Sequence, residues 1–273
     1  FPVLLCVFVP LCEKNPRHML KVRILGSGTS SGVPRIGNDW GTCDPAEPRN
    51  RRTRASILVE SATTRILVDT SPDMREQLLA ADVADVDAVI WTHDHADHCH
   101  GIDDLRQLMH VRGKPVRGLA SAATCASLPE RFRYAFQGGG PYRAIATMEL
   151  LVDGMTIGDI RVRTVDQPHG GITSAGLRFD GGGKSVGYAT DFSEFLPDMR
   201  QLYTGLDLWV ADALRHEPHP THPHLAQTLA WARQCEARHT VLVHMDTTMD
   251  YRMLQAELPD GVEPGYDGME IVV

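Results

Sequence analysis

The sequence lacks both the cysteine pattern of a secreted scaffold and the positive charge of a protein that coats nucleic acid. Its six cysteines are scattered over 273 residues without a CxxC pair. This argues against a disulfide framework and for free thiols in a reducing compartment, the cytoplasm. Lys and Arg number 27 against 35 Asp and Glu, so the formal net charge is -8. Because partners bound through phosphate contacts usually need a basic face, the composition disfavours nucleic acid as a partner.

The sequence also lacks an apolar run that could cross a bilayer. The apolar stretch at residues 1–12 is too short for a span, and no basic region precedes it as in a secretory signal. We therefore expect no membrane partner, and we interpret residues 1–18 as an N-terminal extension outside the fold. No linker, repeat or low-complexity tract interrupts residues 19–273, which are expected to form one domain.

Short runs rich in β-branched residues predict strands, and some of these follow one another directly as hairpins. The predicted pairs are 55–61 with 64–70, 148–153 with 159–165, and 174–180 with 184–190. Other strands alternate with helix-like stretches such as 72–81, 102–111 and 122–136. Ser71 is expected to cap the first of these helices, with Pro72 at its first position. Hairpins mixed with strand–helix units indicate an α/β (α+β) fold of two packed sheets with helices outside.

Two local patterns are interpreted without a function. The basic residues Arg49, Arg51, Arg52 and Arg54 are expected to form a solvated loop. The loop 26–32 has the spacing G-x-G-x-x-x-G, one residue longer than a dinucleotide-binding motif, and no helix can begin directly after it. No dinucleotide cofactor is therefore expected, although freed backbone amides in such a loop can contact anions.

The strongest functional signal is the segment Thr92-His93-Asp94-His95-Ala96-Asp97-His98. It follows the apolar run 88–91, which we interpret as a buried strand. Polar side chains that leave a sheet at a strand end can converge on a metal. Imidazole and carboxylate ligands suit zinc, or harder ions such as manganese and iron. The alternative, a histidine-rich surface turn that binds nothing, is disfavoured by four ligand-type residues within six positions.

This motif resembles the His-x-His-x-Asp-His signature of the metallo-β-lactamase superfamily. The resemblance extends over residues 19–273, through the loop 26–32, Asp69, His169, Asp191 and His244, each at the end of a strand-like run. It implies a four-layer αββα sandwich with metals at one sheet edge. It also implies that the chain is a metal-dependent hydrolase with two divalent ions, zinc or manganese.

The resemblance assigns roles to individual residues. His93, His95 and His169 would hold one ion, Asp97, His98 and His244 would hold the other, and Asp191 would bridge them. Asp69 would support the metal loop, and Asp97 is also a candidate catalytic residue. An Asp at 191, where some relatives have Cys, is similar to the dinuclear phosphodiester and thioester hydrolases.

A second histidine group lies in the proline-rich segment 214–225. Thr221-His222-Pro223-His224-Leu225 looks like the place where phosphodiesterases of this superfamily carry a catalytic histidine, so His222 is expected to assist the leaving oxygen. The other three histidines, His216, His219 and His224, are interpreted as surface-loop residues.

Within the superfamily, the segments 32–34 and 265–271 are similar to the cyclic phosphodiesterases of the carbon–phosphorus lyase pathway. Those relatives carry a cysteine cluster that forms a separate structural zinc site. Only Cys43 of that cluster is present here, and Thr247 stands where a histidine would complete it. No structural zinc is therefore expected.

The expected function is a dinuclear phosphodiesterase that hydrolyses a small phosphodiester, a cyclic ribose or nucleotide phosphate, by attack of a metal-bridging hydroxide. A tRNA 3′-processing endonuclease is the first alternative, but the segment 113–148 is short and not basic as a tRNA-gripping arm would be. A thioester or lactone hydrolase is the second. A metal scaffold without catalysis is disfavoured, since no ligand is missing. The oligomeric state stays open, with a homodimer among the options.

Overall fold

The computed structural model describes residues 19–273 and has two seven-stranded sheets at its centre. The first sheet, in spatial order, contains β14 (Glu270–Val272), β1 (Lys21–Gly26), β2 (Ser56–Glu60), β3 (Arg65–Val68), β4 (Ala88–Trp91), β5 (Val116–Ala120) and β6 (Ala146–Leu150). Strands β3 to β6 run parallel, so the carboxyl ends of β3, β4 and β5 meet at one edge. The predicted extension at residues 1–18 lies outside the described residues.

The second sheet also contains seven strands. Its order is β13 (Val262–Pro264), β12 (Thr240–Val243), β11 (Leu208–Asp212), β10 (Lys184–Ala189), β9 (Ile172–Gly181), β8 (Ile160–His169) and β7 (Met155–Ile157). Strands β10 to β13 are parallel, while β9 is antiparallel to both β10 and β8. The carboxyl ends of β8, β10, β11 and β12 therefore share an edge.

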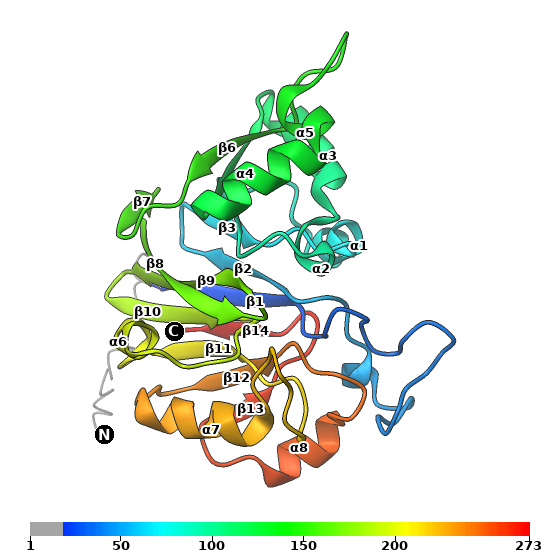
Figure 1. Ribbon diagram of the computed structural model, residues 1–273, viewed down its shortest axis with the longest axis vertical. Coiled ribbons are helices and arrows are strands. Elements are labelled where there is room, and N and C mark those ends of the chain that lie inside the picture. The colour runs from blue at the N-terminus through cyan, green and yellow to red at the C-terminus, as the bar shows by residue number, and fades with distance from the viewer. Residues whose placement is uncertain (1–18) are drawn as a thin grey trace, which may run out of the picture.

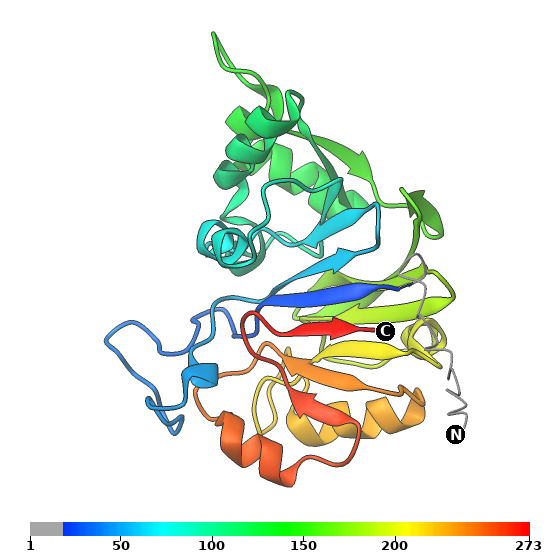
Figure 2. The ribbon, with the colours of Figure 1, turned by 180° about the vertical axis from the view of Figure 1, so that it is seen from behind.

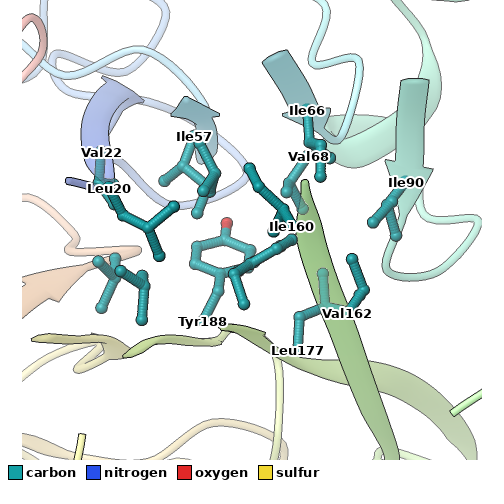
Figure 3. Close-up of a cluster of buried hydrophobic side chains, with 14 of the residues drawn as sticks. Leu20, Val22, Ile57, Ile66, Val68, Ile90, Ile160, Val162, Leu177 and Tyr188 are labelled. Carbon is teal, nitrogen blue, oxygen red and sulfur yellow. The ribbon is translucent and has the colours of Figure 1, made fainter. Parts of the chain in front are cut away.

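The two sheets face each other across an apolar core. In β4, Ala88 and Ile90 face the second sheet, whereas Val89 and Trp91 pack against the helices outside. This is the period of two expected of a strand, and all four residues are buried because both faces of the sheet are covered. Figure 3 shows Ile90 and its neighbours pointing toward Leu177 and Tyr188 of the other sheet.

Helices cover the outer face of each sheet, which completes four layers (Figures 1 and 2). On the first sheet these are α1 (Met74–Ala80), α2 (Ala96–Cys99), α3 (Leu105–Arg112), α4 (Ala122–Arg131) and α5 (Arg133–Gln137). On the second they are α6 (Pro197–Tyr203), α7 (Leu225–Gln234) and α8 (Tyr251–Glu257). The predicted αββα sandwich is confirmed. Within residues 19–273 we find no helix with the length and apolarity that a bilayer crossing requires.

Some predicted boundaries are wrong for local reasons. Helix α1 begins at Met74, after the N-cap Asp73, and the Ser71 hydroxyl accepts a hydrogen bond from the Asp73 amide before the helix starts. The stretch 122–136 is two helices that meet at Phe132. Strand β5 was not predicted because its centre is Gly118. A Cβ there would lie 2.4 Å from the Trp91 ring, so the glycine serves close packing inside the sheet.

Candidate metal centre

The metal motif occupies the carboxyl end of β4. His93 lies two residues after the end of the strand, His95 is the N-cap of α2, and Asp97 and His98 lie within that helix. Asp69, at the end of β3, holds this turn together. Its carboxylate accepts hydrogen bonds from the backbone N–H and hydroxyl of Thr92, both at 2.8 Å, and lies 2.7 Å from Nδ1 of His98. Asp69 thus has the supporting position that was predicted for it.

Three further predicted residues reach the same place from the second sheet. His169 ends β8, Asp191 follows β10 and His244 follows β12. Asp191 and His244 have positive φ angles of 54° and 60°, as does Asp69 at 64°. Non-glycine residues seldom adopt this conformation, and such residues concentrate at functional sites. The left-handed turn directs each side chain into the edge that the two sheets share.

The structure brings all seven predicted ligand residues together in two groups. One contains His93, His95, His169 and Asp191, and the other contains Asp97, His98, Asp191 and His244; within each group the candidate ligand atoms lie within 4.8 Å of one another. Asp191 belongs to both. Its Oδ2 is 3.5 Å from Nε2 of His169 and 3.9 Å from Nε2 of His93. Its Oδ1 is 3.2 Å from Nε2 of His98 and 3.4 Å from Nε2 of His244. One carboxylate therefore presents one oxygen to each group.

Unpaired nitrogen atoms show that the groups fit metal ions. The Nε2 atoms of His93, His98 and His244 are buried, and no atom of residues 19–273 forms a hydrogen bond with them. Buried polar atoms in proteins are nearly always paired. Imidazole nitrogens and carboxylate oxygens at this spacing suit two divalent cations of the zinc or manganese type.

The charges of the site also favour the binding of metal ions. Burial opposes charge on His98, yet the carboxylates of Asp191 and Asp97 raise its pKa well above the usual range. Burial likewise opposes charge on His244, but Asp191 and Asp212 raise its pKa to about 9. In contrast, burial lowers the pKa of His93 well below its ordinary value. The carboxylates thus require positive charge nearby, which protons on histidines or bound metal ions can supply, and metal binding at such sites releases protons.

His222 lies beside the two groups and is held by a residue that the sequence analysis did not single out. Its Nδ1 is 2.9 Å from Oδ2 of Asp212, the last residue of β11, and its Nε2 is 3.9 Å from Oδ2 of Asp191. The His222 ring stacks on His244 with centroids 4.8 Å apart. Asp212 also accepts a 3.0 Å hydrogen bond from the backbone N–H of Asp191. It could have been found, because it is a polar residue at the end of a buried strand like Asp69.

Asp212 and His222 also form a third potential ligand group with Asp191 and His244. Asp191 and His244 already belong to the second group, so an ion in this third group would compete for the same two residues. Oδ2 of Asp212 is already engaged by the His222 ring and the Asp191 amide, which favours a supporting role for it.

The structure of the surrounding loops differs from two of the expectations. Arg52 is only 2% exposed and donates to the carbonyl oxygens of Met249 at 2.6 Å and Asp246 at 3.3 Å, so the solvated-loop interpretation is wrong for this residue. His219 is half-buried, and its ring centroid is 5.2 Å from that of His222. His216 is exposed, as predicted.

The glycine-rich loop and the C-terminal segment are joined by one carboxylate. Asp267 accepts hydrogen bonds from the backbone N–H groups of Ser27 and Thr53 at 2.9 and 2.7 Å. A Cβ at Gly26 would lie 2.0 Å from the carbonyl oxygen of Arg54. The glycine therefore serves close packing of two chain segments.

Cys43 provides a test of the expected absence of a structural zinc. Its Sγ is buried, 3.8 Å from the Arg52 guanidinium. We expect Cys43→Ser to leave the metal content and the melting temperature nearly unchanged, because one thiolate cannot build a closed four-ligand site and serine keeps an acceptor beside Arg52. Elemental analysis of both proteins checks this. Loss of about one ion per chain in the variant would contradict it, since structural metal sites contribute directly to folding.

Two packed sheets with outer helices and a histidine–aspartate cluster at their shared edge define a metal-dependent hydrolase. Residues 64–245 match the family model of the β-lactamase superfamily domain, and the chain belongs to this superfamily. The superfamily predicted from the histidine motif is thereby confirmed.

The chain is also similar to individual proteins. The chain is similar to a new diphosphatase from the PhnP family that has a crystal structure. The two sequences are 33% identical, and the two structures match with a TM-score of 0.84 over 93% of this chain and 97% of that one. Zinc-bound PqqB from Methylobacterium extorquens, at 20% identity and a TM-score of 0.74 over 92% of this chain and 99% of that one, shows a shared fold alone. An octanoyltransferase of Porphyromonas gingivalis is 30% identical over 92% of this chain, which spans only 51% of that protein's length.

Proposed function

We propose that this chain is a dinuclear metal-dependent phosphodiesterase acting on small molecules, with a cyclic ribose or nucleotide phosphate as the expected substrate. The observation that carries the proposal is the position of Asp191, whose two oxygens face two separate groups of ligand-type residues. The similarity to a PhnP-family diphosphatase supports phosphorus as the atom attacked.

Different residues would hold the two metal ions and orient the attacking water. His93, His95 and His169 would hold one cation and Asp97, His98 and His244 the other, with Asp191 between them. Two such ions, when bound, lower the pKa of a shared water and offset charge on phosphoryl oxygens. Asp97, which faces the same space, can orient the attacking water by accepting a hydrogen bond from it.

His222 would act on the other side of the reacting phosphorus. Asp212 fixes its ring through Nδ1, so Nε2 is directed toward Asp191. A proton on Nε2 can be given to the leaving oxygen, and the Asp212 carboxylate stabilises the imidazolium that carries this proton. The pair thus supplies a general acid whose orientation is set before substrate binds.

One alternative has a specific observation behind it. The similarity to part of an octanoyltransferase favours keeping a thioester hydrolase as the second candidate, since the same site could direct water to an acyl carbon. For a tRNA precursor, the net charge of -8 leaves little of the counterion release that dominates binding of long nucleic acids.

The substrate class can be tested by comparing kcat/KM for four compounds: a cyclic ribose phosphate, a linear aryl phosphodiester, an octanoyl thioester and a tRNA precursor. We expect the cyclic phosphate to be best with either zinc or manganese, because ring strain reduces the binding energy needed to reach the transition state. If the tRNA precursor or the thioester is cleaved most efficiently, the proposed substrate class is wrong although the metal centre stands.

A further inference from the structure

His169 and Asp191 come from strands that are not neighbours in the second sheet. His169 ends β8 and Asp191 follows β10, and β9 runs between these strands in the opposite direction. Adjacent strands lie about 4.8 Å apart, so the ends of β8 and β10 are separated by roughly twice that distance. Nε2 of His169 nevertheless lies 3.5 Å from Oδ2 of Asp191. The separation of these two ligand atoms therefore depends on contacts that hold the two strand ends together.

A buried hydrogen-bond network makes these contacts. Gln167, on β8, donates from Nε2 to the carbonyl oxygen of Thr190 at 3.1 Å and to the hydroxyl of Ser174 at 3.0 Å. Ser174, on β9, donates in turn to the carbonyl oxygens of Asp191 at 2.8 Å and Thr190 at 3.1 Å. The network thus reaches from a residue two positions before His169, across β9, to the peptide groups on both sides of the Asp191 α-carbon.

The same hydrogen bonds stabilise the left-handed conformation of Asp191. A non-glycine residue with a φ angle of 54° persists only where surrounding contacts hold it. Ser174 binds the carbonyl group on each side of the Asp191 α-carbon, and the Asp191 N–H donates to Asp212. Loss of these bonds would let the backbone return to an ordinary conformation and turn the carboxylate away from His169.

Tyr203 and Gly176 fix the orientation of the Gln167 side chain. The Tyr203 hydroxyl, from α6, donates to Oε1 of Gln167 at 2.9 Å. Because the carbonyl oxygen of Thr190 can only accept, Nε2 of Gln167 must face it and Oε1 must face Tyr203. A Cβ at Gly176 would lie 2.3 Å from the Tyr203 hydroxyl and 2.7 Å from Oε1, so the glycine leaves room for this contact. Gln167, Ser174 and Tyr203, which we call the glutamine network, are at most 1% exposed, and buried polar groups that are all paired form a rigid unit.

We propose that the glutamine network sets the metal affinity of the ligand group that contains His169. It does so by fixing His169 and Asp191 relative to each other, so its members are positioning residues that touch neither metal nor substrate. This inference rests on the metal centre of the proposed function and adds no chemical step to it. The other ligand group shares Asp191, but its remaining ligands come from the α2 turn and the end of β12, outside the network. The ion held with His169 should therefore depend on Gln167 far more than the other ion does.

Two ligand variants allow the two groups to be measured separately. His244→Ala removes a ligand from the group without His169, so zinc binding to this protein reports on the group with His169, and His169→Ala does the converse. In the His244→Ala protein we expect Gln167→Met, which keeps the length of the side chain but none of its hydrogen bonds, to weaken zinc binding about 10–100-fold, the usual cost of losing the support of a metal ligand. In the His169→Ala protein the same change should alter zinc binding no more than about twofold, as for sites that act independently.

Tyr203→Phe tests whether the effect passes through the network. The substitution removes one hydroxyl, whose hydrogen bonds are to Gln167 and the carbonyl oxygen of Tyr188. It frees the Gln167 amide to turn, so it should also weaken zinc binding in the His244→Ala protein, by a smaller factor. If Gln167→Met does not fold, this milder variant decides.

Ser185→Ala is the matched control for the loss of a buried hydrogen bond in the same sheet. Ser185 lies near the other end of β10, and its hydroxyl is 3.3 Å from the carboxylate of Asp207. We expect it to lower the melting temperature of the metal-free protein about as much as Tyr203→Phe does, with zinc binding unchanged. Calorimetric titration and melting curves on the same metal-free samples check both quantities.

The outcomes separate the network from the proposed function. Unchanged zinc affinity in the His244→Ala protein, or equal weakening in both ligand variants, would show that the network only supports the fold, and either result overturns the inference. If the original protein hydrolyses no phosphodiester, the proposed function fails, while the zinc titrations still decide whether the network positions the ligands.

Discussion

Asp191→Ala is expected to remove metal from both positions and to abolish hydrolysis. Its two oxygens face different ligand groups, at 3.2 Å from Nε2 of His98 and 3.5 Å from Nε2 of His169, so a single substitution takes one ligand from each group. Removing one group that stabilises the transition state electrostatically lowers turnover roughly 10²–10³-fold. We expect a larger loss here, because both ligand groups lose a ligand. The protein itself should hold about two ions per chain, because seven ligand-type residues are too many for one tetrahedral ion.

Elemental analysis after metal reconstitution and a turnover assay on the same samples check the expectation. Asp94→Asn is the matched control. Asp94 belongs to the same motif, but its carboxylate contacts Ser127 and Arg131 and lies in neither ligand group, so the control should keep both ions and its activity. One ion or none in the original protein, or two ions retained in Asp191→Ala, would contradict the bridging role.

The site could be predicted because its residues share one local signal. His93, His169 and Asp191 each lie at the end of a strand or within two residues after it, and within each sheet the parallel strands bring their carboxyl ends to one edge. The fold followed from the mixture of hairpins and strand–helix units. Asp212 carries the same signal at the end of the buried strand β11 and could have been chosen on that ground, although it has no place in the metal motif.

Other features depend on contacts between segments far apart in the sequence. Arg52 is buried because carbonyl oxygens of residues 246 and 249, almost two hundred positions later, accept its hydrogen bonds. A cluster of arginines in a loop is usually solvated, so no local pattern distinguishes this case. The position of His219 likewise follows from how the loop 214–224 closes on itself, which is a tertiary property.

His222→Ala is expected to keep both metal ions and to lose roughly 10²–10⁴-fold in turnover on substrates with an alkyl or ribose leaving oxygen, the range for general acid catalysis. The side chain lies 3.9 Å from Asp191 through Nε2, yet its Nδ1 is already engaged by Asp212 at 2.9 Å. This contact orients the ring for proton donation, but His98, a candidate metal ligand, is held by Asp69 in the same way, so the metal content of the variant decides between the two roles. Loss of metal from the variant would instead assign His222 to the third ligand group.

The leaving group decides whether the proton transfer itself is what His222 contributes. An alkoxide is a poor leaving group and needs a proton as the bond to phosphorus breaks, whereas 4-nitrophenolate departs without one. The loss in His222→Ala should therefore be large on the cyclic ribose phosphate and small on bis(4-nitrophenyl) phosphate. Asp212→Asn keeps an acceptor for Nδ1 but removes the charge that stabilises the imidazolium, so it should show the same dependence on the leaving group with a smaller loss. Exogenous imidazole, which fits the space left by the deleted ring, should restore part of the activity of His222→Ala but not of Asp212→Asn. An equal loss on both substrates would mean that His222 shapes the site, and the general acid would then have to be another group.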